Sequence, residues 1–299
     1  MKLATLSHGG RPALGVVEGD TVLDLTAGRV GAPASVQDFL ALPEHDRAET
    51  LRAARKAPRL SLDAVRLHAP IPAPRLILCT GLNYAAHARE MGKAIPKAPA
   101  IFAKSPGAVA GPYDPVAHPG FSDSLDYEGE LALVIGRAAR AVSADEAAAV
   151  IAGYMVLNDF SLREHLRVEA LVLAKSADGF APCGPWLTLR DAAPKPDAMQ
   201  LRTFVNGDLR QQACAEDMIF DPFALIEIVT RFITLQPGDI LSTGSPPGSG
   251  AGFAPPRFLK PNDRVRVEID GLGAIENVIN PAQSPSRKET AHVFDEQGS

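Results

Sequence analysis

The segment LDYEGELALVIG, residues 125–136, places acidic side chains directly before an uninterrupted apolar run. Its pattern predicts a strand over 127–135, in which residues two apart project from the same face. Glu128 and Glu130 then lie side by side, while Gly129 leaves the opposite face bare. Because the apolar run predicts burial and buried carboxylates need partners, Mg²⁺ or Mn²⁺ is indicated. The alternative is an exposed acidic edge strand, the common meaning of an isolated Glu-x-Glu.

A third oxygen ligand is available at the end of the next apolar run. Residues 153–158 read GYMVLN and predict a strand, and Asp159 follows where that strand ends. Ends of strands are common positions for site residues, so Asp159 is a candidate metal ligand. The alternative is that Asp159 caps a helix that begins after Phe160, and the local pattern alone favours this cap.

The segment GLNYAAHARE, residues 81–90, follows a predicted strand and reads as a turn into a short helix. His87 and Glu90 are three residues apart and therefore neighbours on that helix, so the carboxylate can orient the imidazole as a general base. The alternative is a surface ion pair, the default for this spacing. The glycines that bound residues 81–92 also predict a mobile lid that admits substrate and then excludes water.

The segment PIPAP, residues 70–74, marks a domain boundary. Each proline fixes its own backbone and restricts the residue before it, which predicts a stiff, extended connection. Residues 1–70 predict a small domain, an antiparallel sheet followed by a helical stretch over 35–56. Residues 71–285 predict the main domain, and residues 286–299 lose all periodicity and predict a loose tail.

Local patterns locate further elements of the main domain. Strict alternation of charged and apolar residues over 264–269 predicts a half-buried strand. Ser143 with Glu146 has capping-box spacing, and Asp221 before Pro222 predicts a second helix start. Other strands are predicted over residues 76–79, 100–103, 154–158, 186–189, 201–205 and 239–242.

Length, charge and cysteine content exclude several classes of protein. The chain has 299 residues, 46% of them apolar, which is enough for a sizeable core. Its 30 basic and 35 acidic residues give a net charge of −5, so neither nucleic acid nor an anionic membrane is an expected partner. Without a spanning segment or a signal-peptide core, the chain is expected to be cytoplasmic. Cys79, Cys183 and Cys214 lack CxxC spacing, so neither a disulfide framework nor a structural zinc site is expected.

Several further blocks follow one another in order along the chain. They are GYMVLNDFSLRE at 153–164, AKSADGF at 174–180, NGDLRQ at 206–211, DMIF at 217–220 and LQPGDILSTGSPPGSG at 235–250. Together with residues 81–90 and 125–136, these blocks resemble the fumarylacetoacetate hydrolase superfamily over residues 75–280. The resemblance is incomplete at Ala215, Ser245 and Ser249, and these departures concern the side chain of the substrate, not the metal.

The resemblance implies an α+β fold. It implies a mixed β-roll catalytic domain of the fumarylacetoacetate hydrolase type with a small N-terminal α/β appendage, assembled as a homodimer. In such proteins the residues that match Glu128, Glu130 and Asp159 ligate Mg²⁺ or Mn²⁺. The same-face argument for the two glutamates agrees with this ligand set.

The resemblance also implies roles toward a substrate. Lys175 is implied to bind and polarise the oxo-acid end of the substrate, with Arg163 nearby. Gln211 and Thr243 are implied to contact the substrate, and the His–Glu pair of residues 81–90 resembles a dyad that a lid carries over the metal. Lys175 follows an apolar run, and a buried ammonium group needs an anionic neighbour.

These assignments predict a divalent-metal-dependent hydrolase that cleaves the C–C bond of an acylpyruvate-like 1,3-dicarbonyl 2-oxo acid. The metal and Lys175 would hold the oxo-acid end, and His87 with Glu90 would activate water against the distal carbonyl. Within the family, the alternatives are decarboxylation of an oxaloacetate-type acid and hydration or isomerisation of an unsaturated 2-oxo acid. Another alternative, a catalytically silent binding protein, would predict the loss of a ligand or of the base, and both are present.

Overall fold

The computed structural model describes residues 1–166 and 170–282 of the chain. The loose tail predicted over residues 286–299 lies outside the described residues. The described chain is mostly sheet with few helices, so the predicted α+β class is confirmed. Within these ranges, no helix has both the length and the apolar character needed to cross a membrane.

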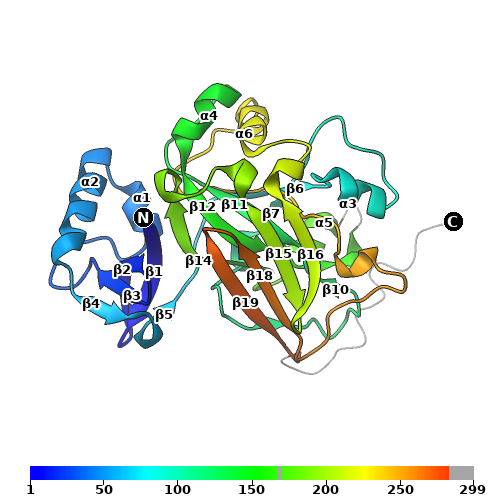
Figure 1. Ribbon diagram of the computed structural model, residues 1–299, viewed down its shortest axis with the longest axis horizontal. Coiled ribbons are helices and arrows are strands. Elements are labelled where there is room, and N and C mark those ends of the chain that lie inside the picture. Colours follow the sequence, from blue (N-terminus) through cyan, green and yellow to red (C-terminus); the bar gives the residue numbers. More distant parts are fainter. Residues whose placement is uncertain (167–169, 283–299) are drawn as a thin grey trace.

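Antiparallel strands and two short helices form the N-terminal part, which is blue in Figure 1. The stretch predicted to be helical forms α1 (Val36–Ala41) and α2 (Glu44–Ala53), which Pro43 separates. Ser35 caps α1, because its side chain accepts a hydrogen bond of 3.0 Å from the backbone N–H of Asp38. The strands are β1 (Lys2–His8), β2 (Arg11–Glu18), β3 (Thr21–Asp24), β4 (Arg59–Ser61) and β5 (Arg66–Leu67).

A large mixed sheet runs through the molecule. Beyond the N-terminal part its strands are β6 (Ile77–Gly81), β7 (Ala100–Lys104), β8 (Val109–Ala110), β11 (Gly129–Ile135), β12 (Ile151–Asn158), β14 (Ala181–Leu189) and β17 (Ile240–Ser242). The described sheet has 12 strands in the order β4-β3-β2-β1-β14-β12-β11-β17-β6-β7, with β5 beside β1 and β8 beside β14. Every residue of β11 is buried, which confirms the burial predicted from its apolar run.

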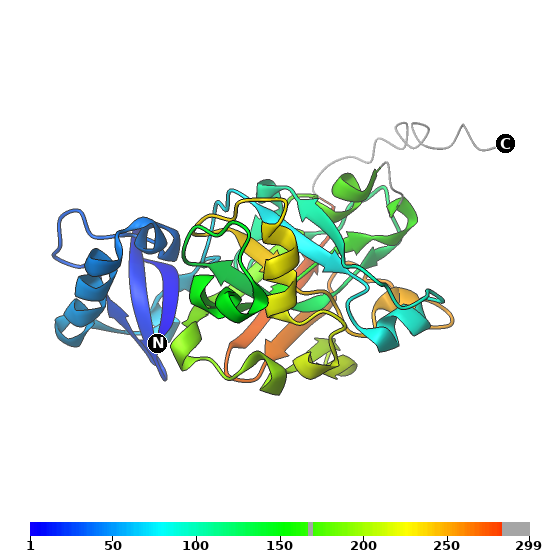
Figure 2. The same ribbon diagram turned by 90° about the horizontal axis from the view of Figure 1, so that it is seen from above.

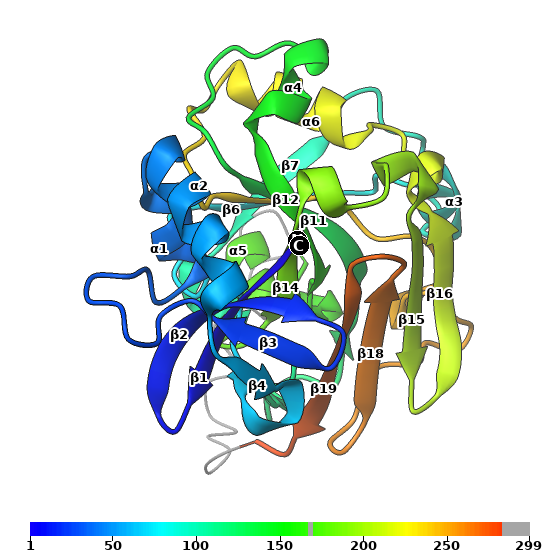
Figure 3. The same cartoon turned by 60° about the vertical axis from the view of Figure 1, so that its left-hand side comes forward.

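The N-terminal strands continue this sheet directly. β1 pairs antiparallel with β14 through Lys2 opposite Thr188 and Leu3 opposite Leu187, and Figure 3 shows the two strands side by side. One hydrophobic cluster contains residues from both parts of the chain. A division into separate domains at residue 70 stays a prediction, since sheet and core both run across that position.

A second, antiparallel sheet packs against the face formed by β11, β12 and β14 (Figure 1). Its strands are β9 (Val116–Ala117), β15 (Gln200–Val205), β16 (Asp208–Cys214), β18 (Arg264–Ile269) and β19 (Gly273–Asn280), in the order β16-β15-β18-β19-β9, where only β9 is parallel to its neighbour. Strand β18 has the bounds that its alternation predicts, and Val265, Val267 and Ile269 are buried. Its apolar side therefore faces the core between the sheets.

Helices α4 (Ala144–Val150) and α6 (Pro222–Thr230) lie together at one end of the sheets (Figures 1 and 2). The predicted capping box of α4 is present, and the backbone N–H of Ser143 donates to Glu146 Oε2 at 3.2 Å. Asp221 caps α6 by accepting from two N–H groups of the first turn at 2.8 and 2.9 Å. Both helix starts therefore follow from local signals alone.

The substitution Leu133→Ala in β11 should lower the free energy of unfolding by about 2–5 kcal/mol. Leu133 is fully buried in the cluster that joins the two sheets, so its truncation removes apolar contacts and leaves a cavity. Leu209→Ala is the control, because Leu209 is 49% exposed and its truncation should cost less than about 0.5 kcal/mol. Urea denaturation measures both, and equal losses would contradict this packing.

Candidate active site

The acidic segment quoted first lies at the centre of the candidate site, where these further elements meet: α3 (Ala85–Glu90), β10 (Leu125–Asp126), β13 (Ser161–Leu162) and α5 (Leu171–Lys175). The strand begins at Gly129, later than predicted, because the backbone N–H of Glu128 donates to Asn158 Oδ1 at 2.9 Å instead of to a strand carbonyl. Glu128 is 6% exposed and Glu130 only 2%. The alternative of an exposed acidic edge strand is therefore wrong.

Asp159 follows β12 and completes a buried group with the two glutamates, called the acidic triad below. Its backbone N–H donates to the carbonyl of Glu128 at 2.8 Å, which extends the pairing of β11 with β12. One carboxylate oxygen from each of Glu128, Glu130 and Asp159 lies within 4.8 Å of the others. Strand β13 follows Asp159, so the N-cap interpretation is wrong. Converging buried oxygens of this kind fit a hard divalent cation.

Basic side chains neutralise part of the triad. Lys175, at the end of α5, donates to Glu128 and to Asp159 Oδ2, the latter at 2.8 Å. Arg163 donates to Glu128 Oε1 at 2.8 Å and to Asp126 Oδ2 at 2.7 Å. The structure thus places Lys175 and Arg163 in contact with the triad. The resemblance, by contrast, implies a position near the substrate.

Two residues of this cluster were missed by sequence reasoning. Lys104, at the end of β7, has a fully buried side chain that donates to Asp159 Oδ1 and, at 3.3 Å, to the carbonyl of Phe160. In the sequence, Lys104 is marked only by its position at the end of the apolar strand AIFAK. This position does not indicate which acidic residue it contacts. Asp126 stands two residues before Glu128, so the spacing argument used for the glutamates could have found it.

Glu130 has a different environment from Glu128. Ser242 Oγ and the backbone N–H of Gly244, the latter at 3.1 Å, donate to Glu130 Oε2. Burial, followed by the like charges of Asp159 and Glu128, raises the pKa of Glu130 to about 8. Glu130 is therefore the carboxyl group that most needs a cation in order to ionise near neutral pH.

The buried charges of the cluster come close to balance. Burial alone would raise the pKa of Glu128, but Arg163 and Lys175 outweigh it and hold that pKa below its usual range. Burial would likewise lower the pKa of Lys175, and Asp159 with Glu128 instead raises it. With Glu130 ionised, the carboxylates exceed the cations by one charge, so a divalent cation that ionises Glu130 would leave the cluster positive and suited to an anionic ligand. The four carboxylates belong to Asp126, Glu128, Glu130 and Asp159, and the three cations belong to Lys104, Arg163 and Lys175.

Helix α3 carries the predicted dyad. His87 Nδ1 lies 2.9 Å from Glu90 Oε2, and His87 is only 3% exposed, so the alternative of a surface ion pair is wrong. Burial raises the pKa of Glu128, and Arg163 and Lys175 lower it. His87 lowers it too, by a smaller amount. The charge of the imidazole therefore acts on a member of the acidic triad.

The predicted substrate contacts lie beside the triad with side-chain hydrogen bonds of their own. Gln211 Oε1 accepts from the backbone N–H of Gly129 at 3.0 Å, and its Nε2 donates to Ser245 Oγ at 2.7 Å. Thr243 Oγ1 donates to the carbonyl of Leu131 at 2.9 Å. These bonds hold β11 in place, and contact with a substrate stays a prediction for both residues.

The loop over residues 244–252 holds carboxylates of the site through its backbone. The N–H of Gly248 donates to Glu90 Oε1 at 2.9 Å. The N–H groups of Gly250 and of the residue after it donate to the two oxygens of Asp126 at 2.7 and 3.0 Å. This loop therefore connects the dyad on α3 with the triad, and Figures 1 and 2 show its short turn next to α3.

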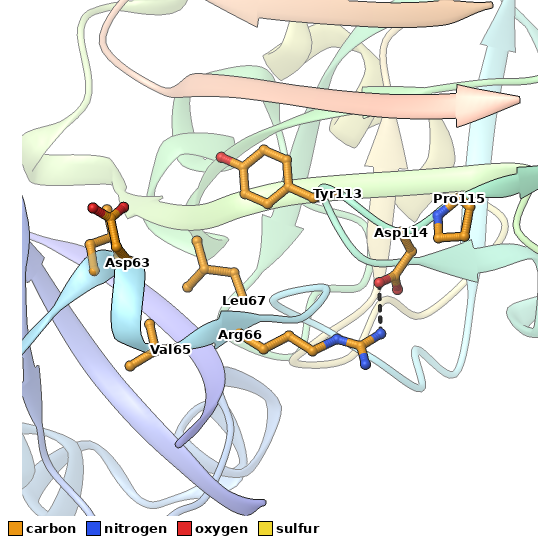
Figure 4. A pocket seen from close by; sticks show the side chains of 8 residues that line it. Asp63, Val65, Arg66, Leu67, Tyr113, Asp114 and Pro115 are labelled. Atoms are coloured by element: carbon orange, nitrogen blue, oxygen red, sulfur yellow. Dashed lines mark hydrogen bonds and ion pairs between the residues drawn. The ribbon is translucent and has the colours of Figure 1, made fainter. Parts of the chain in front are cut away.

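A surface cavity of about 610 Å³ lies apart from the triad (Figure 4). It separates the turn over Leu62–Ala64 and β5 from the segment over residues 113–115, and Arg66 forms an ion pair of 2.9 Å with Asp114 there. Its lining contains no residue of the acidic triad or of the His87–Glu90 dyad. The lining residues are Leu62, Asp63, Val65, Arg66, Leu67, Tyr113, Asp114 and Pro115.

Comparisons with known proteins agree with the resemblance seen in the sequence blocks. The family model Fumarylacetoacetate (FAA) hydrolase C-terminal matches residues 76–280. Oxaloacetate tautomerase YisK of Bacillus subtilis (strain 168) is 43% identical over 224 residues, 73% of this chain and 74% of that protein. The mitochondrial oxaloacetate tautomerase FAHD2B of Bos taurus is 38% identical over 278 residues, 91% of this chain and 88% of that protein.

A solved structure with the same fold contains ligands. It is maleylpyruvate hydrolase from Sphingobium sp. SYK-6 in complex with manganese (II) ion and pyruvate. Its TM-score to this chain is 0.79 at 34% identity, and the match covers 95% of this chain and 100% of that chain. The predicted fold type is therefore confirmed together with the α+β class.

Proposed function

Because this chain belongs to the fumarylacetoacetate hydrolase family, we propose that it is a metal-dependent enzyme that interconverts the enol and keto forms of an oxaloacetate-type 2-oxo acid. The observation that carries the proposal is the His87–Glu90 dyad, which the 244–252 loop connects by hydrogen bonds to Glu130 of the acidic triad. The names of both tautomerase relatives support this reaction over the C–C hydrolysis predicted from sequence. The hydrolase stays as a second candidate.

The acidic triad is the site that we propose for Mg²⁺ or Mn²⁺. Its converging, buried carboxylate oxygens match the hard oxygen ligands that both ions prefer, and the raised pKa of Glu130 reflects a carboxyl group without a sufficient counter-charge. When bound, the ion supplies Lewis-acid polarisation of the 2-oxo group. The manganese and pyruvate named for the Sphingobium enzyme support this assignment.

The dyad provides the proton transfer. The hydrogen bond to Glu90 uses His87 Nδ1, so Nε2 is the atom that exchanges a proton with the substrate. In the keto-to-enol direction, Nε2 removes a proton from carbon 3 of the acid, and the imidazolium then delivers that proton to the 2-oxo oxygen. The reverse sequence restores the keto form, and no atom is gained or lost. Lys175 and Arg163 hold positive charge beside the carboxylate end of the substrate.

The second candidate, C–C hydrolysis of an acylpyruvate, uses the same side chains. Its base would take a proton from water, and the water oxygen would attack the distal carbonyl. The maleylpyruvate hydrolase fold match supports this chemistry. The two reactions differ in their products, because hydrolysis breaks the carbon chain and tautomerisation does not.

The test is product analysis with purified protein and either metal. Oxaloacetate supplied as its enol should lose enol absorbance faster with protein than without, while the total amount of oxaloacetate stays constant. Acetylpyruvate should then remain intact. Release of acetate and pyruvate from acetylpyruvate, without accelerated enol loss, would replace the proposal by the hydrolase. Release of CO₂ from oxaloacetate would instead favour the decarboxylase alternative.

A homodimer in the cytoplasm completes the proposal. Light scattering of the purified chain measures the dimer, and a fluorescent fusion locates the protein in cells. The mitochondrial location named for the bovine relative belongs to that protein.

A further inference from the structure

Arg210 stands at an irregularity in the second sheet. Thr203 of β15 lies opposite Gln211 and Phe204 lies opposite Leu209, so Arg210 has no partner on β15 and forms a bulge. Bulges next to active sites redirect a side chain from the regular alternation of a strand. Gln211 accepts a hydrogen bond from the backbone N–H of Gly129, between the two glutamates of the triad, so this bulge adjoins the strand that carries them.

The guanidinium group of Arg210 has unused donors. Its side chain is only 14% exposed, and its Nε and Nη1 are buried without a hydrogen-bond partner in the described part of the chain. Its Nη2 lies 3.5 Å from Asp208 Oδ2, a carboxylate on a side chain that is 75% exposed. A buried donor left without an acceptor costs about 1–3 kcal/mol, so its retention needs an explanation.

A second arginine shares an aromatic ring with Arg210. The guanidinium carbon of Arg210 lies 5.4 Å from the centre of the Phe253 ring, and that of Arg257 lies 4.5 Å from it. The ring attracts each cation, but the two cations repel each other. Arg257 is exposed and makes no ion pair with any residue that the structure describes. The two guanidinium charges therefore have a single ion-pair partner among the described residues, the largely exposed Asp208.

This arginine group adjoins the active site. Tyr127, which precedes Glu128, donates through its hydroxyl to the carbonyl of Gly248 at 3.0 Å. The 244–252 loop, which holds the dyad and leads into Phe253, also packs on the bulge. A Cβ at Gly248 would lie 1.9 Å from the carbonyl oxygen of Arg210, so the loop backbone and the bulge are in direct contact.

We propose that Arg210, assisted by Arg257 across the ring of Phe253, binds the distal carboxylate of a 2-oxo diacid whose oxo-acid end lies at the acidic triad. This inference rests on the proposed function and assigns the residue that selects a diacid over a monoacid. Within the planar guanidinium fork of Arg210, Nε–H and Nη1–H are free in the described chain, and a carboxylate oxygen can accept a hydrogen bond from either. Arg257 adds a charge that solvent screens.

The test compares two acids of equal carbon number by calorimetry with Mn²⁺-loaded protein. These acids are 2-oxoglutarate, a stable diacid, and 2-oxovalerate, in which a methyl group replaces the distal carboxylate. The substitution Arg210→Gln should weaken 2-oxoglutarate binding about 10- to 100-fold, the value of lost charge-assisted hydrogen bonds. Binding of 2-oxovalerate should change less than about twofold. With oxaloacetate as substrate, KM should rise while kcat stays nearly constant.

Arg202→Gln is the matched control, because Arg202 lies on the neighbouring strand β15 and pairs with Glu268 at 2.8 Å. It removes the same charge from the same sheet and should leave the binding of both acids unchanged. Arg210→Lys should restore part of the diacid binding, since it keeps the charge but not the fork. Equal weakening of both acids, or an unchanged diacid affinity in Arg210→Gln, would overturn the proposal.

The binding measurement is independent of turnover. If the wild-type protein does not accelerate enol loss, the proposed function fails, while an Arg210-dependent preference for 2-oxoglutarate would still support the subsite. If enol loss is accelerated but wild-type protein binds the diacid no tighter than the monoacid, the subsite fails and the function stands.

Discussion

Glu130→Gln should abolish metal binding and metal-dependent turnover while the protein stays folded. The substitution removes one of three converging carboxylates, and a neutral amide is a much weaker ligand for a hard divalent cation. Glutamine keeps the shape of the side chain, and its amide oxygen can still accept from Ser242 and Gly244. Burial and the like charges of Asp159 and Glu128, which raise the pKa of Glu130, place no such cost on a neutral amide, so the metal-free fold should lose no stability.

Calorimetry with Mg²⁺ and with Mn²⁺ measures the binding, and urea denaturation measures the fold. Glu216→Gln is the control, because Glu216 is exposed. This substitution removes the same charge from a position outside the site. It should bind both ions as the wild type does. If Glu130→Gln bound the ions with undiminished affinity, the assignment of the triad as the metal site would be wrong.

His87→Ala should lower turnover by about 10²–10⁴-fold, the usual contribution of a general base. Glu90 holds the orientation of the imidazole through a hydrogen bond of 2.9 Å, and the 244–252 loop bonds both to Glu90 and to Glu130 of the triad. The side chain is not a member of the triad, so the affinity for Mg²⁺ or Mn²⁺ should stay close to that of the wild type. Steady-state kinetics and calorimetry on the same preparation test both statements.

His45→Ala is the matched control for the loss of an imidazole, because the side chain of His45 is 80% exposed. It should leave turnover and melting temperature unchanged. A His87→Ala protein that melts as the wild type does, yet keeps full turnover, would remove the dyad from the mechanism. The proton transfer would then need another base, and the proposal for the reaction would lose the observation that carries it.

Local patterns determined much of the secondary structure. The alternation over 264–269 sets the bounds of β18, because a strand repeats every two residues and needs only its own side chains to show which face is buried. The starts of α4 and α6 follow from Ser143 and Asp221 for the same reason, since a cap bonds to N–H groups within its own turn. The candidate metal ligands followed from same-face spacing and from ordered blocks, but the spacing argument placed Glu128 inside a strand that begins only at Gly129.

The tertiary structure determined which residues contact one another and which strands pair. Lys104 contacts Asp159, which is 55 residues away in the sequence, and β1 pairs with β14 through Lys2 and Thr188. Sequence periodicity describes only neighbouring residues, so it cannot predict contacts between residues so far apart. The bulge at Arg210 depends on the register of β15 against β16, which only the paired strands define. A sequence specifies which side chains are available for burial and for charge, whereas the folded backbone determines which of them meet. The composition of the buried charge cluster, and the two unpaired nitrogens of Arg210 at the bulge, therefore required the tertiary structure.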